Sequence, residues 1–314
     1  MQATLPILLI FILTFTVKPK ESAEYELSIK LDSGQLAGTY YAINPKPEKV
    51  VLIIPGSGPT DRNGNSAYGL ENNSLKMIAD ELALAGIPSL RVDKRGTAGS
   101  QSALTSEGSL TFDRFVDDMG LWVKLLTDSL QFRSVVVIGH SQGSLVGMLT
   151  AFKNEEVSGL ISIAGPGESI DATLIRQIKT QAPVLSDETE AILDSLRMGS
   201  TVKNVNPLLQ SIFRPSVQPF LISYMQYNPT AEIARMGIPV LVINGTTDIQ
   251  VSTTDAEALH QAAKNSQLLI IDEMNHVLKS APEDRAENLA TYNNPSLPLA
   301  DGLMDGITQF IQNL

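Results

Sequence analysis

The sequence predicts an α/β fold, in which a mostly parallel sheet is covered by helices on both faces. Short runs of β-branched and other apolar residues recur along the chain, as expected for strands that are buried on both faces. Between them lie segments with apolar residues at helical spacing. Such alternation is typical of parallel sheets, which bind ligands beyond the carboxyl ends of their strands. With 314 residues and 43% hydrophobic content, the chain can bury one large core.

The N-terminal segment differs from the rest of the chain. Residues 5–17 form an uncharged apolar run that is followed by Lys18 and Lys20. The run is too short to span a membrane comfortably and has the length of the hydrophobic region of a signal peptide. No Lys or Arg precedes it, and the residue two positions before Ala23 is not small. We still expect residues 1–23 to be a signal peptide rather than an uncleaved anchor. The protein is then exported, periplasmic or secreted, with no stable membrane span after processing.

Residues 24–164 are expected to form the first part of the core. Gly, Pro, Asn and Asp separate the apolar runs and mark the turns between elements. Two strands are predicted within residues 25–41, around the turn at 32–34, and further strands at 49–54, 89–92, 135–138 and 160–164. Helices are predicted from the apolar positions of residues 75–82, which Gly86 ends, and of residues 112–126 and 145–152.

The alternation of strands and helices is interrupted once, between Gly165 and Gly237. This stretch has helical patterns and several prolines, but no convincing core strand. We therefore expect residues 165–237 to be a helical cap that is inserted over the strand ends. Residues 238–314 form the second part of the core, with strands predicted at 240–244 and 268–271 and helices at 256–263 and 303–310.

The stretch from Val135 to Gly143, Val-Val-Val-Ile-Gly-His-Ser-Gln-Gly, changes from a strand to a helix within about three residues. A chain that turns this sharply needs small residues, and Gly139 and Gly143 flank the turn. Ser141 stands at its apex, where its hydroxyl would project from the end of the sheet. The bare Gly-x-Ser-x-Gly pattern also occurs by chance, but the flanking strand and helix indicate a nucleophile elbow.

A serine hydroxyl attacks well only when a base removes its proton. His276 follows the strand at 268–271 by a few residues, so it is expected at the sheet edge where the elbow opens. His140 adjoins the serine, but at an elbow its side chain points elsewhere. His260 falls within a predicted helix and is expected to be a surface or packing residue. We therefore expect His276 to be the base.

The histidine in turn needs a carboxylate that fixes its tautomer and supports the imidazolium. Asp248 follows the strand at 240–244 after a short loop, and it is the preferred candidate. Glu168 follows the preceding strand and is the rival acid. Asp272 and Glu273 adjoin the strand that leads to the histidine, and they are expected to face solvent.

The composition argues against several other functions. The chain has no cysteine, which excludes thiolate nucleophiles, disulfides and Cys-based metal sites, and its three histidines lack metal-binding spacing. No metal or cofactor is expected. A net charge of −11 without any basic cluster argues against nucleic acid or an anionic membrane surface as a partner. The Gly56-Ser-Gly58 turn lacks the third glycine of a dinucleotide loop, and Pro59 opposes an immediate helix.

The order Ser141, Asp248, His276 resembles that of the α/β-hydrolase superfamily, over nearly all of residues 25–314. The resemblance is closest to its serine esterase and lipase-like members. These often carry the stretches that stand here as Pro-Gly-Ser-Gly-Pro-Thr-Asp-Arg-Asn-Gly-Asn and Asp-Lys-Arg-Gly, at residues 55–65 and 93–96. The resemblance implies an α/β-hydrolase fold.

The resemblance also implies that the backbone N–H groups of Ser57 and Gln142 form an oxyanion hole. Charge that develops on a carbonyl oxygen needs rigid donors, and a glycine-rich loop beside the elbow could supply one. One departure from the family pattern is that Pro55-Gly56 stands where many relatives have His-Gly. The backbone donor survives this change.

We expect an exported serine hydrolase that cleaves carboxylic esters of small-molecule acyl substrates through an acyl-enzyme on Ser141. The same triad would also serve a serine peptidase or a thioesterase. A non-catalytic binding protein with this fold is the alternative from another class. Asp61 and Arg62, as an ion pair, and the charged residues 93–95 are expected to hold loops in place rather than to contact substrate.

Overall fold

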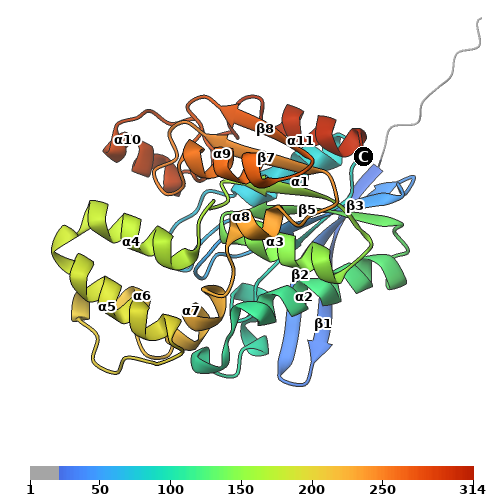
Figure 1. Cartoon of the computed structure of the whole chain (residues 1–314). Coiled ribbons are helices and arrows are strands. Elements are labelled where there is room, and N and C mark those ends of the chain that lie inside the picture. The colour runs from blue at the N-terminus through green and yellow to red at the C-terminus, as the bar shows by residue number, and fades with distance from the viewer. Residues whose placement is uncertain (1–20) are drawn as a thin grey trace, which may run out of the picture.

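The computed structural model describes residues 21–314, which form a central eight-stranded sheet flanked by helices (Figure 1). Its strands are β1 (Glu21–Leu31), β2 (Gly34–Asn44), β3 (Lys49–Ile54), β4 (Ser89–Val92), β5 (Ser134–His140), β6 (Val157–Ile163), β7 (Val240–Gly245) and β8 (Ser266–Ile271). The spatial order is β1-β2-β4-β3-β5-β6-β7-β8. β1, β2 and β4 pair antiparallel to one another in turn, and all pairs from β4 to β8 are parallel. The predicted α/β fold class is confirmed, with an antiparallel hairpin at one edge of the sheet.

Most of the predicted signal peptide, residues 1–20, lies outside the described residues. Residues 21–23 are the first residues of β1, where Glu21 pairs with Asn44 and Ala23 with Ala42. Cleavage after Ala23 would therefore shorten β1 by three residues.

The helices are α1 (Ser74–Leu84), α2 (Phe112–Lys124), α3 (Gln142–Lys153), α4 (Ile170–Gln181), α5 (Ser186–Arg197), α6 (Gln210–Phe213), α7 (Gln218–Tyr224), α8 (Pro229–Ile233), α9 (Thr253–Ala262), α10 (Arg285–Ala290) and α11 (Leu303–Gln312). Within residues 21–314, none of these helices combines the length and the hydrophobicity that a transmembrane span requires.

The sheet has an apolar core on each face, because successive residues of a strand point to opposite sides. In β5, Val135 and Val137 pack in the cluster that α2, α3, α8 and α9 cover. Val136 and Ile138 pack in the opposite cluster, which α1 and α11 cover. All four side chains are fully buried. Each contributes about 1.5–3 kcal/mol on burial, which explains why this strand is an unbroken apolar run rather than an alternating one.

Local patterns located the buried strands well and the short irregular elements poorly. β3 and β4 have the predicted bounds, whereas β6 begins at Val157, three residues before the predicted start. α2 ends at Lys124 and continues as a π-helical turn, Leu125–Ser129. The short helix α10 was not predicted. Its six residues are too few to show a helical period.

The segment between β6 and β7 contains the helices α4 to α8. Figure 1 shows α4–α7 as a separate group, in yellow-green to yellow, beyond one end of the sheet. This group has a small apolar cluster of its own, formed by Leu174, Ile178, Ile192, Leu193, Leu196, Val205, Leu209, Phe213 and Leu221. α8 returns to the sheet, where Ile233 is fully buried in the core cluster that α3 shares.

Candidate active site

Ser141 occupies a sharp turn between β5 and α3. Its backbone has φ +54° and ψ −122°, a conformation that L-residues rarely adopt and that costs about 1–3 kcal/mol. Hydrogen bonds on both sides hold it: the Ser141 N–H donates to the Ile163 carbonyl at 2.8 Å, and its carbonyl accepts from the Ser144 N–H at 2.9 Å. The turn is therefore fixed by the end of β6 and by the first turn of α3.

The two glycines of the pattern are required by close backbone contacts. A Cβ atom on Gly139 would lie 2.3 Å from the Gly143 carbonyl oxygen. One on Gly143 would lie 2.5 Å from the carbonyl oxygen of Ile54, at the end of β3. Both distances are far below van der Waals contact, so any side chain at either position would force the elbow apart. The elbow predicted from the sequence is thus present with the packing that explains its glycines.

His276 and Asp248 form a buried hydrogen-bonded pair. The His276 Nδ1–H donates to Asp248 Oδ2 at 2.8 Å, and the two side chains are 7% and 1% exposed. The other carboxylate oxygen, Oδ1, accepts the backbone N–H groups of Gln250 and Val251 at 2.8 and 2.9 Å. These bonds fix the plane of the carboxylate. Since Nδ1 carries the proton that Asp248 accepts, Nε2 of the neutral ring is free to take a proton.

The rival acids have other partners. Glu168 lies at the entrance to the cap and pairs with Arg176 at 2.7 Å. Asp272 and Glu273 are exposed, as expected. The carboxylate that contacts His276 is that of Asp248.

His140 is placed as an anchor and not as a base. Its Nε2 lies 2.8 Å from the backbone carbonyl oxygen of His276, and because a carbonyl can only accept, Nε2 carries a proton. Burial, reinforced by the neighbouring His276 ring, lowers the pKa of His140 to about 4. His140 is therefore neutral at physiological pH, and it holds the backbone of the loop that carries His276. The third histidine, His260, is only half-buried and bonds to the Ser266 hydroxyl at 2.7 Å.

Ser141 and His276 line the same cavity, which has a volume of about 240 Å³ and which we call the histidine cavity. Within residues 21–314 no direct hydrogen bond joins the Ser141 hydroxyl to His276. Such bonds are often long in unliganded enzymes and tighten when substrate binds. Ser141 also lines a second cavity of about 330 Å³, the cap cavity, which extends beneath α4, α6 and α7.

Ser57 and Gln142 line the cap cavity together with Ser141. Gln142 is the first residue of α3, where a backbone N–H has no acceptor within its helix. The Ser57 N–H follows β3 in the glycine-rich loop, and no backbone carbonyl of the described residues accepts it. Both donors can therefore bond to an oxygen that enters the cavity beside Ser141.

The cap cavity and the histidine cavity share one electrostatic property. In the part of the chain that the structure describes, neither has an Asp, Glu, Lys or Arg in its lining. Apolar and aromatic side chains dominate the wall of the cap cavity, namely Ile170, Leu174, Ile212, Val217, Phe220, Leu221 and Tyr224. The polar side chains in the wall of the histidine cavity include Thr60, Ser66, Tyr68, Asn72, Gln250 and Tyr292.

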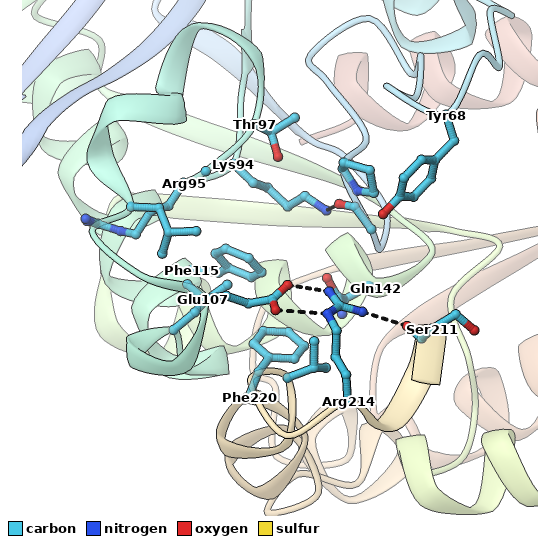
Figure 2. Close-up of a pocket in the computed structure, with 16 residues that line it drawn as sticks. Tyr68, Lys94, Arg95, Thr97, Glu107, Phe115, Gln142, Ser211, Arg214 and Phe220 are labelled. Carbon is cyan, nitrogen blue, oxygen red and sulfur yellow. Dashed lines mark hydrogen bonds and ion pairs between the residues drawn. The ribbon is translucent and has the colours of Figure 1, made fainter. Parts of the chain in front are cut away.

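A third cavity of about 320 Å³ adjoins the cap cavity at Gln142 and Phe220 (Figure 2). Glu107 and Arg214 both line it and form a two-bond ion pair, with Arg214 Nε donating to Glu107 Oε2 at 2.9 Å. The Ser216 hydroxyl also donates to Glu107. The carboxylate is therefore already satisfied from within the protein.

The charged residues of the loops after β3 and β4 mainly brace the fold, as expected, but one ion-pair partner differs from the prediction. Arg62 pairs with Asp93 and Glu26, at 2.7 and 2.6 Å, and not with Asp61. Asp61 instead accepts two backbone N–H groups of its own turn. A carboxylate at the start of a tight turn accepts the N–H groups of that turn first, and this leaves the arginine free for a distant partner.

The chain matches a known family over more than half of its length. Residues 68–282 match the model of the family described as serine aminopeptidase, S33. The chain belongs to this family. It is an α/β hydrolase of the serine hydrolase class, and the resemblance inferred from the sequence is confirmed.

Solved structures of other α/β hydrolases share the fold of this S33 family member. Est1E of Butyrivibrio proteoclasticus, solved with ferulic acid bound, is 19% identical with a TM-score of 0.59, over 91% of this chain and 98% of that one. An esterase of Pyrococcus furiosus is 20% identical with a TM-score of 0.57, over 81% and 84%. A thermophilic esterase of Thermogutta terrifontis, with malate bound, is 15% identical with a TM-score of 0.54, over 93% and 98%. No curated protein sequence matches the chain.

Two contacts of the site were not predicted in detail from the sequence. One is the bond from His140 to the His276 backbone. The other concerns Lys94, which was expected to hold a loop, although the sequence did not say that this loop is the one that carries Ser57. Both join residues that are distant in sequence, and no local period or spacing marks them. The indication that the sequence offered for Lys94 was its place among three charged residues directly after a predicted strand.

Proposed function

We propose that this S33 family member is a carboxylic ester hydrolase that acts through an acyl-enzyme on Ser141. The observation that carries the proposal is the strained Ser141 elbow, which opens into the same cavity as the buried His276–Asp248 pair. A strained serine, a histidine with a free Nε2 and a fixed carboxylate supply the three roles that acyl transfer requires.

The reaction proceeds in two steps. The Ser141 oxygen attacks the ester carbonyl carbon while His276 Nε2 removes its proton, and Asp248 stabilises the imidazolium that results. The carbonyl oxygen becomes an oxyanion, which accepts the N–H groups of Ser57 and Gln142. The tetrahedral intermediate collapses, and the alcohol leaves with the proton from His276. Water then attacks the acyl-enzyme by the same route, which releases the carboxylic acid and restores Ser141.

The lining of the cavities favours ester hydrolysis over the aminopeptidase activity in the family's description. An aminopeptidase must bind the cationic amino group of its substrate, and burial of a cation requires a partner of opposite charge. Neither cavity that reaches Ser141 contains a carboxylate within residues 21–314. The nearby Glu107 is engaged by Arg214 and Ser216. An uncharged substrate fits these walls better.

The position of His276 supports one orientation of the substrate's alcohol and acyl halves. The proton passes from His276 to the leaving alcohol, so the alcohol lies in the histidine cavity. The acyl group then lies in the cap cavity, whose wall suits a medium-length alkyl or an aromatic acyl chain. Two proteins with the same fold, from Pyrococcus furiosus and Thermogutta terrifontis, are named as esterases, which agrees with ester hydrolysis in general.

Labelling with a fluorophosphonate tests the proposal. We expect one covalent adduct in the intact mass of the wild-type protein, and none in Ser141→Ala. Ser144→Ala, which removes a serine hydroxyl one turn farther along α3, is the matched control and should label like the wild type. A panel of p-nitrophenyl esters, an acyl thioester and aminoacyl p-nitroanilides should show turnover mainly of the esters. Folded wild-type protein that neither labels nor exceeds Ser141→Ala on any ester would overturn the proposal in favour of a binding protein.

We also propose that the protein is exported, on the basis of the apolar run at residues 5–17. N-terminal sequencing of the protein recovered from the exported fraction of its host should find a start after residue 23. A protein that is retained with Met1 intact would contradict export by cleavage.

A further inference from the structure

Three consecutive charged residues follow β4, and one of them has no counter-charge. Asp93 pairs with Arg62, and Arg95 pairs with Asp118. Within residues 21–314, Lys94 takes part in no ion pair. Its ammonium instead donates to two backbone carbonyls in the glycine-rich loop after β3.

Lys94 is buried at an energetic disadvantage. Its side chain is 2% exposed, and burial without a counter-charge lowers its pKa to about 7. Figure 2 shows the side chain extended above Phe115 toward the glycine-rich loop, and the ammonium lies 5.6 Å from the centre of the Phe115 ring. Carbonyl dipoles and an aromatic face compensate only in part for the lost hydration. An apolar residue of this length would pack in the same space, so stability alone does not account for a lysine here.

The two carbonyls that Lys94 holds belong to Gly56 and Gly58, on either side of Ser57. The Gly56 carbonyl and the Ser57 N–H are parts of the same peptide group. In a trans peptide these two bonds lie in one plane and point in opposite directions. A cation that fixes the Gly56 oxygen therefore fixes the direction of the Ser57 N–H. The bond to the Gly58 oxygen, at 2.7 Å, holds the loop on the other side of Ser57.

The loop that Lys94 holds lies directly against the nucleophile. A Cβ atom on Gly56 would lie 3.2 Å from Ser141 Cβ, so the loop backbone packs on the elbow without any side chain between them. Ser57 and Ser141 line the cap cavity and the histidine cavity together. The direction of the Ser57 N–H is thus decisive for a charge that develops next to Ser141.

We propose that Lys94 is a positioning residue for the oxyanion hole. By holding the Gly56 and Gly58 carbonyls, it directs the Ser57 N–H at the oxyanion without itself touching the substrate. A cation on the Gly56 oxygen also draws electron density from the amide nitrogen, which strengthens the N–H as a donor. This inference rests on the proposed ester hydrolysis, since only an oxyanion on the substrate needs the aligned donor.

Lys94→Met, which keeps the length of the side chain but removes the ammonium, tests the inference. Loss of one oxyanion-hole donor lowers kcat about 100- to 1000-fold, and misalignment of a donor that remains should lower it about 10- to 100-fold. We expect KM to stay within about threefold, because the ground-state ester does not depend on the oxyanion. The protein should also be titrated with a trifluoromethyl ketone, which forms an oxyanion on Ser141, and with the matching methyl ketone. Affinity for the first should fall by the same factor as kcat, and affinity for the second should not change.

Arg95→Gln is the matched control, because it removes the adjacent buried cation, whose partner is Asp118 and not the loop. It should lower the thermal midpoint and leave the ratio of the two ketone affinities unchanged. If Lys94→Met does not fold, Lys94→Gln serves in its place, since it keeps a neutral donor and should give a smaller loss in the same direction.

The inference is overturned if a folded Lys94 variant keeps kcat within about threefold, if both ketones lose affinity together, or if Arg95→Gln reproduces the pattern. Failure of the ester hydrolysis itself would be visible earlier and separately. In that case the wild-type protein would neither label with a fluorophosphonate nor bind the trifluoromethyl ketone more tightly than the methyl ketone.

Discussion

The core and the cap of this protein bury their apolar residues in different ways. In the core, the sheet is covered on both faces, and the strand residues Val135 to Ile138 have no exposed surface. In the cap, helices α4–α7 share one small cluster, and large apolar residues such as Val184, Met198 and Leu208 remain 89%, 77% and 73% exposed. The choice of side chains is therefore restricted by packing throughout the core strands. In the cap it is restricted only where the helices face the cavity or their own cluster.

The difference in packing corresponds to a difference in role. Ser141, His276 and Asp248 all follow core strands, and their geometry depends on backbone contacts that leave no room for a side chain. The cap contributes side chains that shape the cap cavity but no member of the hydrogen-bonded pair. A change in the core should therefore affect the chemical step, and a change in the cap should affect which substrate is chosen. Three predictions test this division.

The largest effect is expected from the acid of the proposed triad. Asp248→Asn should lower kcat about 10³- to 10⁴-fold, because an amide favours the wrong tautomer of His276. Glu168→Gln, at the entrance to the cap, is the matched control and should lower kcat less than about tenfold, mainly through substrate binding. Steady-state kinetics on a p-nitrophenyl ester measures both, after circular dichroism has shown that each variant folds. The reverse order of effects would place the acid at the end of β6 and not of β7.

A second effect concerns a loss of stability at acid pH that arises from His140 in the core. The folded protein keeps His140 neutral down to a pKa of about 4, whereas the unfolded chain protonates it near the ordinary histidine pKa of 6.5. The unfolded state therefore binds more protons between these values, and stability falls as the pH is lowered from 6.5 to 4. The full difference amounts to about 3 kcal/mol at the acid end. Above pH 6.5 this contribution is constant.

Urea unfolding of the wild type and of His140→Gln, followed from pH 7 to pH 4, measures this contribution. The wild type should lose stability more steeply than His140→Gln over this range. His260→Gln, which replaces a half-buried histidine, is the control and should follow the wild type. If the free energy of unfolding of the wild type and of His140→Gln depends on pH in the same way, His140 is protonated as easily in the folded protein as in the unfolded chain, which would contradict the prediction.

The smallest effect is expected from the wall of the cap cavity. Ile212→Trp should fill part of the cavity beneath α6 and lower kcat/KM for an octanoate ester about tenfold, while an acetate ester is hydrolysed as before. Leu208→Trp enlarges an exposed residue of the same cap that lines neither cavity, and it should change neither rate. Equal losses for both esters in Ile212→Trp would mean that the cap takes part in the chemical step.

The success of the sequence-based predictions follows the same division. The core strands were located because each is buried on both faces, and a strand of this kind appears in the sequence as a continuous apolar run. The carboxyl ends of parallel strands meet at one edge, and this topological rule was enough to select His276 and Asp248 as neighbours. Their hydrogen bond at 2.8 Å agrees with that selection, while their catalytic roles remain predictions. The cap helices were expected as a group, but their individual bounds depend on contacts within the group.

By itself, the sequence determined the fold class and the sharp turn at Ser141, and it selected the residues that we propose as nucleophile, base and acid. These depend on local periodicity, on glycines at a sharp turn and on the order of strand ends, all of which are properties of short stretches. Only the tertiary structure decided that His140 anchors the His276 loop, that Arg62 pairs with Asp93, and that Lys94 holds the loop of Ser57. A buried polar group bonds to whichever donor or acceptor the folded chain brings within about 3 Å, and this neighbour is set by the packing of distant segments.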